Sequence, residues 1–449
     1  MVDFYLLLGL YALAGTGVSI AVMKKNTGQS QFFVGGGAIG WIVSAMTYAA
    51  TTYSAFMMVG LVGLSYASGV GALIFELVYL VATVVLLGAY GGRIWQLGRT
   101  HGLVSPMELL GLRYGNATAT AGAILATLAL VPYTAVQVIG LAVILEGYGV
   151  SYSAGVAFAA TVIGIWALLG GLRGVAITDA LQGVFMITVA VFALSWTNTE
   201  FQGFHFDRFP NAVWTPAFFI NLTLPWMFFA LTNPQVLQRL FILERRRDLK
   251  KMIILFAVFG LVYTVIVTMV GFGARFGTMA GAFPEPAGRD QVIVALIGRM
   301  GRVLALPLAL SIVFASVSTA NSILLTLAGV VSRDILRKRN SVVVGRVAVV
   351  VLTAVVALFA LTRPTALVEL SVASSRILIV LLPLLFGVLH SRRGGNATGL
   401  LTIIGGAVIA LASGRLWPSH SSVITLGAVI VLFLVGEQIE RFRRSPEVP

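Results

Sequence analysis

The chain has 449 residues, of which 58% are hydrophobic and 10% are charged, with a mean hydropathy of +0.97 and a formal charge of +14. A soluble domain carries about a quarter charged residues, so this composition indicates a polytopic membrane protein. The absence of cysteine excludes disulfides and thiol chemistry, and the four scattered histidines give no transition-metal pattern.

Apolar segments along the chain predict about thirteen membrane-spanning helices, because a helix needs roughly 20 apolar residues to cross a bilayer. The predicted fold class is therefore all-α. In chain order the segments are 3–23, 37–64, 68–92, 117–148, 151–170, 176–198, 211–241, 249–275, 302–335, 342–362, 366–390, 395–413 and 420–440.

Basic residues gather in alternate connections between these segments, as in Lys24-Lys25, Arg245-Arg246-Arg247 and Arg337-Lys338-Arg339. The positive-inside rule explains this pattern and predicts an external N-terminus and a cytoplasmic C-terminus. The positive charge therefore needs no nucleic-acid partner. The first residues, Met1-Val2-Asp3, lack a basic region, so we expect no cleavable signal peptide.

Two of the predicted helices carry signs of a break in mid-membrane. Segment 211–241 contains Pro225 and Pro234, and each proline removes a backbone hydrogen bond and frees a carbonyl. Segment 37–64 contains the small and polar run from Thr47 to Ser54. Paired broken helices are typical of transporters built from inverted repeats, and their spacing suits repeats over 37–198 and 211–390. The alternative is a proline kink in a plain bundle.

Segment 302–335 concentrates hydroxyl and amide side chains in the middle of an apolar helix. Hydrocarbon cannot hydrogen-bond such groups, so they must face protein, water or an ion. Alternatively, the hydroxyls bond back to carbonyls one turn earlier, or pack at a close helix crossing. The residues are Ser316, Ser318, Thr319, Asn321 and Ser322.

Four stretches of the chain together resemble the sodium/solute symporters, a family that includes proline, pantothenate, sialic acid and sugar carriers. The stretches are FFVGGGAIGW (32–41), PMELLGLRYG (106–115), GGLRGVAITDALQG (170–183), and ASVSTANS (315–322) followed by SRD (332–334). The resemblance covers nearly the whole chain. It implies a LeuT-type fold of two inverted five-helix repeats, with one extra N-terminal helix (1–36) and two C-terminal helices (391–449).

The resemblance also implies a sodium site between segments 37–64 and 302–335. Its ligands would be the carbonyls of Ala50, Tyr53 and Ala315 and the hydroxyls of Ser318 and Thr319. Neutral and anionic oxygens are what hard cations prefer. A backbone carbonyl is free only where a helix is unwound, so this site requires the break near Ala50–Ser54.

In some family members an aspartate matching Asp179 joins a second sodium site, which here would include Asn321 and Ser322. Alternatively, Asp179 is a helix N-terminal acid that interacts with the helix dipole. Thr52 departs from the proline carriers, which have an aspartate at the matching position, so the chain gives no support for proline as the solute.

Three ionisable residues fall within predicted spans: Glu76, Glu369 and Arg376. Because a planar guanidinium suits a carboxylate, we expect Arg376 to hold a carboxylate of the solute; alternatively, it pairs with Glu369 through a neighbour. Further candidates for contact with the solute, each of which could instead serve packing, are Ser54, Glu76, Tyr79, Tyr133, Gln137 and Trp226.

The preferred function is sodium-coupled symport of a small organic solute across the cytoplasmic membrane, with no enzymatic activity. The expected partners are the solute, the sodium ion and membrane lipid, with no nucleic acid and no obligate protein partner. A proton-coupled carrier that uses Asp179 or Glu76 is the nearest alternative. A channel is a third reading, but it would need a continuous polar lining.

Overall fold

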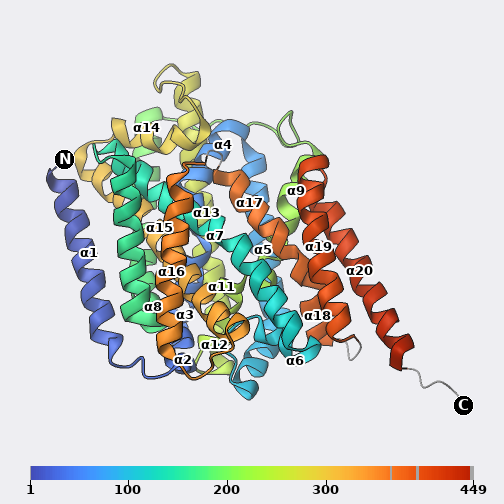
Figure 1. Cartoon of the computed structure of the whole chain (residues 1–449). Helices are drawn as coiled ribbons and strands as arrows, with labels where there is room; N and C mark the ends of the chain where they lie inside the picture. Colours follow the sequence, from blue (N-terminus) through green and yellow to red (C-terminus); the bar gives the residue numbers. More distant parts are fainter. Residues whose placement is uncertain (1, 365–366, 391–393, 445–449) are drawn as a thin grey trace, which may run out of the picture.

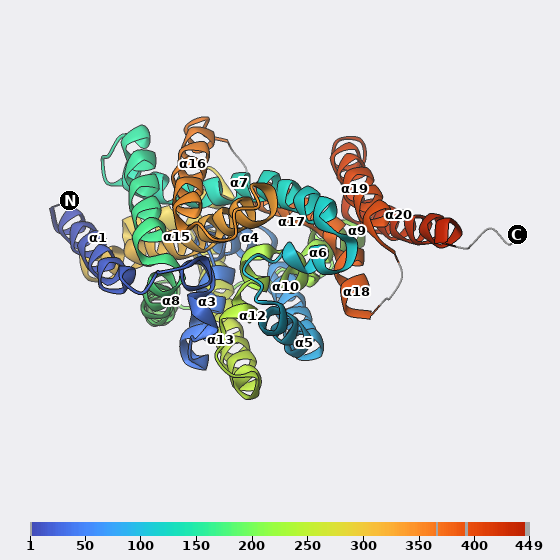
Figure 2. The same ribbon diagram turned by 60° about the horizontal axis from the view of Figure 1, so that its bottom comes forward.

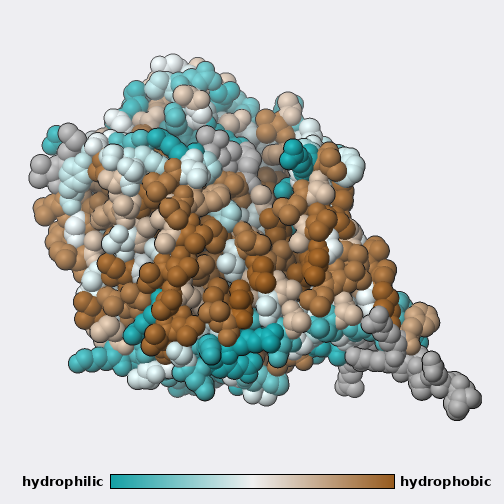
Figure 3. Space-filling view, in the orientation of Figure 1, coloured by the Kyte–Doolittle hydropathy of each residue, from teal (hydrophilic) through white to brown (hydrophobic). Residues whose placement is uncertain are grey.

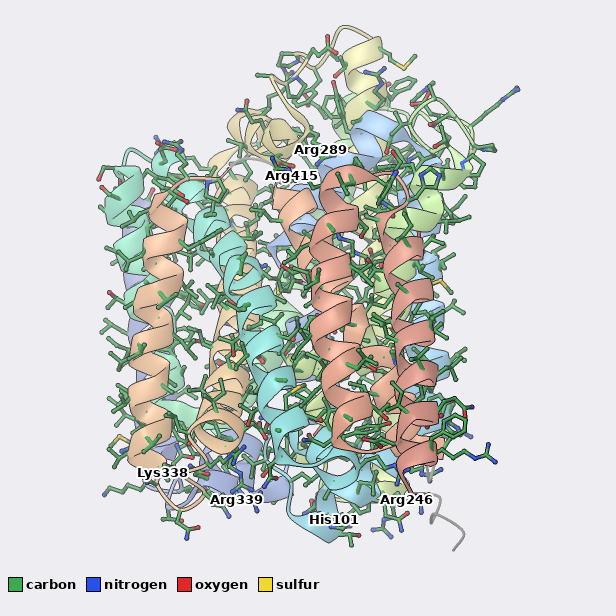
Figure 4. All side chains as sticks on the ribbon, turned by 45° about the vertical axis from the view of Figure 1, so that its right-hand side comes forward. His101, Arg246, Arg289, Lys338, Arg339 and Arg415 are labelled. Carbon is green, nitrogen blue, oxygen red and sulfur yellow. The ribbon has the colours of Figure 1, made fainter. Side chains whose placement is uncertain are left out.

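A belt of apolar side chains crosses the face of the molecule seen in Figure 3, between two polar ends. The computed structural model describes residues 2–364, 367–390 and 394–444. One end carries Lys338, Arg339, His101 and Arg246, and the opposite end carries Arg289 and Arg415 (Figure 4). We call these the Lys338 end and the Arg289 end. The belt is the surface expected of a protein that crosses a membrane.

The long helices of the first half, such as α1, α5 and α7, run between the two ends of the molecule, and the short helices α2 and α6 lie at the Lys338 end (Figure 1). They are α1 (Val2–Met23), α2 (Gln29–Val34), η1 (Gly35–Gly37), α3 (Trp41–Thr52), η2 (Phe56–Leu61), α4 (Val62–Ser68), α5 (Val70–His101), α6 (Glu108–Tyr114), α7 (Asn116–Gly147) and α8 (Tyr152–Phe201).

The second half continues the same all-helical pattern. Its elements are α9 (Pro216–Met227), α10 (Phe229–Thr232), α11 (Pro234–Leu237), α12 (Arg239–Ile242), η3 (Arg246–Asp248), α13 (Leu249–Met279), η4 (Arg289–Gln291), α14 (Val292–Arg299), α15 (Arg302–Val330), η5 (Val331–Ile335), α16 (Val342–Leu361), α17 (Leu367–Leu378), η6 (Ile379–Leu381), α18 (Leu382–His390), α19 (Asn396–Leu416) and α20 (Ser421–Arg444). Figure 2 shows α19 and α20 together at the edge opposite α1.

Two predicted helices, 151–170 and 176–198, form α8 without the intervening loop that the sequence suggested. The chain reverses at Gly171, whose φ of 53° and ψ of −160° are non-helical. A Cβ atom there would lie 2.8 Å from the Phe32 carbonyl oxygen. The Asn26 side chain donates to the carbonyls of Leu169 and Gly170, at 3.1 and 3.0 Å. Glycine alone adopts this conformation without strain, so the turn needs only one residue.

Within the described residues, ten helices are long and apolar enough to cross a membrane, and the bent pair of α3 with η2–α4 makes an eleventh. Two features reconcile this count with the larger number predicted. Helix α8 holds two antiparallel segments on either side of Gly171, and α9–α12 together run between the two ends as four short helices (Figure 1).

Helix α15 forms the centre of the bundle. Most of its residues from Leu308 to Val330 are buried, and it packs against α3, α7, α8 and α16. A helix that is apolar nearly all round and buried on every side is typical of the core of a large protein. Its hydroxyl and amide groups therefore face other helices rather than lipid.

Candidate functional site

Helix α3 ends at Thr52 in the buried interior of the bundle, and this break frees a backbone carbonyl. Tyr53 has φ −91° and ψ 85°, and the axis bends by 52° before η2. In an unbroken helix the Ala50 carbonyl would accept a hydrogen bond from the amide of Ser54. Here it accepts from two hydroxyls of α15 instead, from Ser318 Oγ at 3.2 Å and from Thr319 Oγ1 at 3.0 Å.

Hydrogen bonds thus join Ala50, Ser318 and Thr319, three of the five residues expected to hold sodium, at one crossing of α3 and α15. Ser318 also donates to the Ala315 carbonyl at 3.1 Å, and Tyr53 follows Ala50 at the end of α3. All five residues have no exposed surface. The site offers only neutral oxygens, two of them hydroxyls that can turn their lone pairs to an ion, so its residues fit a hard monovalent cation.

A second polar cluster surrounds Asp179 of α8, about one turn along α15. Thr47 Oγ1 donates to Asp179 Oδ2 at 2.6 Å, and Ser322 Oγ donates to the same oxygen at 3.3 Å. Thr51 Oγ1 donates to Ser322 Oγ at 2.9 Å. The other carboxylate oxygen of Asp179 and both polar atoms of the Asn321 side chain have no hydrogen-bond partner among the described residues. Thus a hydrogen bond joins two of the three residues of the expected second site, Asp179 and Ser322, whereas the Asn321 side chain makes no such bond to them among the described residues.

Arg239 of α12 also belongs to this cluster, and the sequence analysis missed it. The residue is completely buried, and its Nη2 donates to Ser322 Oγ at 2.6 Å. Its guanidinium is close enough to attract Asp179 electrostatically. In the sequence, Arg239 lies six residues before the cationic run Arg245–Arg247. The informative signal was its place five residues after Pro234, in the broken helix.

Four of the residues expected to contact the solute divide into two groups, and the other two, Tyr79 and Tyr133, lie beside Trp226 and near Ser54 respectively. Ser54 and Gln137 satisfy the broken backbone of α3: Ser54 Oγ accepts from the amide of Phe56 at 3.1 Å, and Gln137 Oε1 accepts from the amide of Ala55 at 3.2 Å. Glu76 of α5 and Trp226 of α9 lie in a buried aromatic cluster close by, and Glu76 Oε2 and Trp226 Nε1 have no partner among the described residues.

The structure does not bring Arg376 of α17 to that cluster. Its Nη1 donates to Ser421 Oγ at 2.9 Å, and its guanidinium packs against Gly414. Both neighbours belong to the C-terminal helices α19 and α20. The expectation that Arg376 faces the solute is therefore corrected: this side of α17 faces the C-terminal helix pair. The alternative partner, Glu369, has a side chain that lies outside the described residues.

Comparisons with known proteins agree on one kind of protein. The model of the sodium:solute symporter family matches residues 32–402, which is most of the chain. Sodium/pantothenate symporters of Escherichia coli and Haemophilus influenzae are each 32% identical over 189 and 181 residues. These matches span 41% and 39% of this chain, and only 39% and 37% of the relatives' length.

A longer match reaches the osmoregulated proline transporter OpuE of Bacillus subtilis, with 22% identity over 82% of this chain and 80% of the relative. Among solved structures, a sodium-coupled sialic acid symporter in a substrate-bound outward-open state has a TM-score of 0.84 at 15% identity, covering 97% of this chain and 98% of that one. A nucleobase-cation-symport-1 transporter has a TM-score of 0.64 at 13% identity, covering 90% and 92%. These two matches concern the fold.

Proposed function

This chain belongs to the sodium:solute symporter family, and from that premise we propose that it couples the entry of sodium to the uptake of a small organic solute. The observation that supports this proposal is the pair of hydrogen bonds that Ser318 and Thr319 of α15 donate to the Ala50 carbonyl at the break of α3. A downhill sodium gradient would drive the solute by alternating access, with no covalent chemistry.

The coupling ion would bind the carbonyls of Ala50, Tyr53 and Ala315 and the hydroxyls of Ser318 and Thr319. These residues lie on two helices, so an ion between them would tie the broken α3 to the central α15. Loss of the ion would leave the Ala50 carbonyl held only by the two hydroxyl hydrogen bonds. Binding energy that differs between two arrangements of α3 and α15 is what allows an ion to bias a carrier toward one of them.

We propose that the ion binds at this site alone. Ser322 already accepts hydrogen bonds from Arg239 and Thr51 and donates one to Asp179. A hydroxyl has two lone pairs and one proton, so Ser322 has no lone pair left for a second sodium ion. The Arg239 guanidinium also compensates the negative charge of Asp179, which a second sodium ion would otherwise do.

We further propose that the chain contains two inverted repeats, over 37–198 and 211–390. An extra helix over 1–36 precedes them, and the C-terminal part over 391–449 follows. The Lys338 end would face the cytoplasm, because most of the basic connections lie there (Figure 4). The N-terminus would then be external and the C-terminus cytoplasmic, in the cytoplasmic membrane.

The test uses purified protein and a library of solutes, first by thermal shift and then by uptake into proteoliposomes. We expect sodium chloride to raise the melting temperature more than potassium chloride at equal ionic strength, and a solute to add to this shift only with sodium. Uptake should stop when potassium replaces sodium. Sodium-independent uptake that responds to a proton gradient would instead support a proton-coupled carrier, and uptake that follows the solute gradient alone would support a channel.

A further inference from the structure

One face of α5 presents three buried polar groups toward the interior of the protein. Glu76, Tyr79 and Thr83 lie at positions i, i+3 and i+7, so they share this face. Each is at most 1% exposed. Glu76 Oε2 and the hydroxyls of Tyr79 and Thr83 have no hydrogen-bond partner among the described residues. Buried polar groups normally have hydrogen-bond partners, so this face of α5 is a candidate for contact with a ligand.

Aromatic rings pack around the stretch of α5 that carries Glu76. Trp226 and Phe229 stack at 5.3 Å between centroids, with an interplanar angle of 3°. Tyr79 meets both rings edge-on, at 5.4 Å from Trp226 and 5.5 Å from Phe229. Phe75 meets Trp226 at 6.1 Å. Phe56 also stacks on Trp226, at 5.4 Å, whereas the printed contacts of Tyr79 with Trp226 and Phe229 are edge contacts only. The electron-rich face of an aromatic ring such as Tyr79 attracts cations.

No basic side chain accompanies Glu76. None of the described lysines, arginines and histidines forms an ion pair with it. The titratable groups near enough to feel its charge are the tyrosines Tyr53, Tyr79 and Tyr133. A buried carboxylate without a counter-charge is costly, and it must either take up a proton or meet a cation from outside. An aromatic lining favours the second, because it stabilises a cation and does little for a neutral acid.

The cluster also adjoins the proposed sodium site. Tyr53 ends α3 one turn after Ala50, and its ring lies beside Tyr263 of α13 at 5.9 Å. Its hydroxyl oxygen packs close to Gly260, near the side chain of Leu80 on α5. One residue thus contributes its backbone to the ion site and its ring to the surroundings of Glu76. Binding of a ligand in the cluster would therefore depend on the conformation of α3.

We propose that the solute carries a positively charged nitrogen, a protonated amine or a quaternary ammonium, which pairs with Glu76 among the rings of Tyr79 and Trp226. This inference rests on the proposed function, since it names the chemical class of the solute for the same carrier. It applies to one group of the solute and is compatible with a carboxylate elsewhere on the molecule.

The test compares isosteres that differ only in charge. Choline and its neutral isostere 3,3-dimethyl-1-butanol are probes of a quaternary ammonium, and protonated propylamine and propanol are probes of an amine. Each is titrated against the purified protein by thermal shift, in sodium chloride and in potassium chloride. We expect at least one cation of the two pairs to raise the melting temperature at concentrations where its neutral partner does nothing. Equal shifts by the charged and neutral partners, or no shift by either cation, would overturn the proposal.

The Glu76→Gln variant tests the residue itself. It should weaken binding of the cation by roughly tenfold to a hundredfold while leaving the sodium shift in place. Glu244→Gln, the same change at an exposed residue beside Arg245, is the matched control and should bind like the wild type. Unchanged affinity in Glu76→Gln would overturn the proposal. If this variant does not fold, Trp226→Phe and Tyr79→Phe replace it, and the isosteres on the wild-type protein still decide.

Failure of this inference and failure of the proposed function give different results. If the protein responds to sodium but binds only neutral or acidic solutes, the proposed sodium coupling stands and the proposed cationic solute is wrong. If the protein binds the cation equally well in sodium chloride and in potassium chloride, the proposed cationic solute stands and the proposed sodium coupling is wrong.

Discussion

Arg239 on α12 donates a hydrogen bond of 2.6 Å to Ser322 on α15, and Ser322 in turn donates to Asp179 on α8 at 3.3 Å. One hydroxyl thereby joins a buried cation to a buried anion from three different helices. Removing both charges from water is expensive, and their mutual attraction offsets that cost only while both are present.

Arg239→Gln and Asp179→Asn are therefore expected to destabilise the protein by about 3–5 kcal/mol each, since each leaves one buried charge unpaired. The double variant should be more stable than the sum of the two losses predicts. Thermal unfolding of the four proteins in detergent measures this coupling. Strictly additive losses would contradict an electrostatic link between the two residues.

Arg239→Gln is also expected to change the response to sodium. The substitution frees a lone pair of Ser322 and leaves the Asp179 charge uncompensated, so a second sodium ion gains a site. The sodium dependence of solute uptake should become steeper, with a Hill coefficient that rises from about one toward about two. The wild type is the reference. A wild-type coefficient already near two would refute the single-ion proposal.

Ser318→Ala should abolish most of the sodium-specific stabilisation. The substitution removes one of the hydroxyl ligands proposed for the ion, and an ion at a hundred times its Kd contributes about 2.7 kcal/mol. Ser316→Ala is the matched control, because Ser316 lies on the same buried helix and its hydroxyl donates to the Ile312 carbonyl one turn earlier, at 2.9 Å. The difference between melting temperatures in sodium and potassium chloride measures both. Equal losses in the two variants would show that the serines serve packing alone.

The parts of the site that could be predicted from sequence are those where one helix concentrates an unusual pattern. The hydroxyls of α15 stand out against an apolar background, and the run from Thr47 to Ser54 marked the break of α3. Both signals are local to one segment. That the two segments contact each other was expected only from the resemblance to known carriers. The crossing of α3 and α15 at Ala50 agrees with that expectation.

The positions of Arg239 and Arg376 could not be predicted, because they depend on features that the sequence of a single helix does not encode. The depth of Arg239 follows from the unwinding at Phe228 and Asn233, which divides α9–α12 into short pieces. The direction of Arg376 follows from the rotation of α17 about its axis, and a rotation of half a turn exchanges the bundle interior for the C-terminal helices. Periodicity alone does not fix either quantity in a chain that is apolar on nearly every face.

Gly171→Ala should destabilise the protein by about 1–3 kcal/mol, because a side chain is strained at this φ and ψ. Its Cβ would also press on the Phe32 carbonyl at 2.8 Å. Gly88→Ala, on a helical stretch of α5 with open space around the position, is the control and should be neutral or slightly stabilising. Thermal unfolding separates the two. A stable Gly171→Ala protein would mean that the turn between the halves of α8 can be made another way.

Arg376→Gln is expected to lower stability while leaving the affinity for the solute unchanged. The guanidinium bonds to Ser421 and packs against Gly414 on the C-terminal helices, so its loss removes a charged hydrogen bond worth about 1.5–3 kcal/mol. Ser421→Ala removes the acceptor of the same bond and should lower the melting temperature in the same direction. Thermal shift and the Kd of a solute found in the library are measured on both variants. A loss of affinity above about tenfold in Arg376→Gln, at an unchanged melting temperature, would return Arg376 to the solute site.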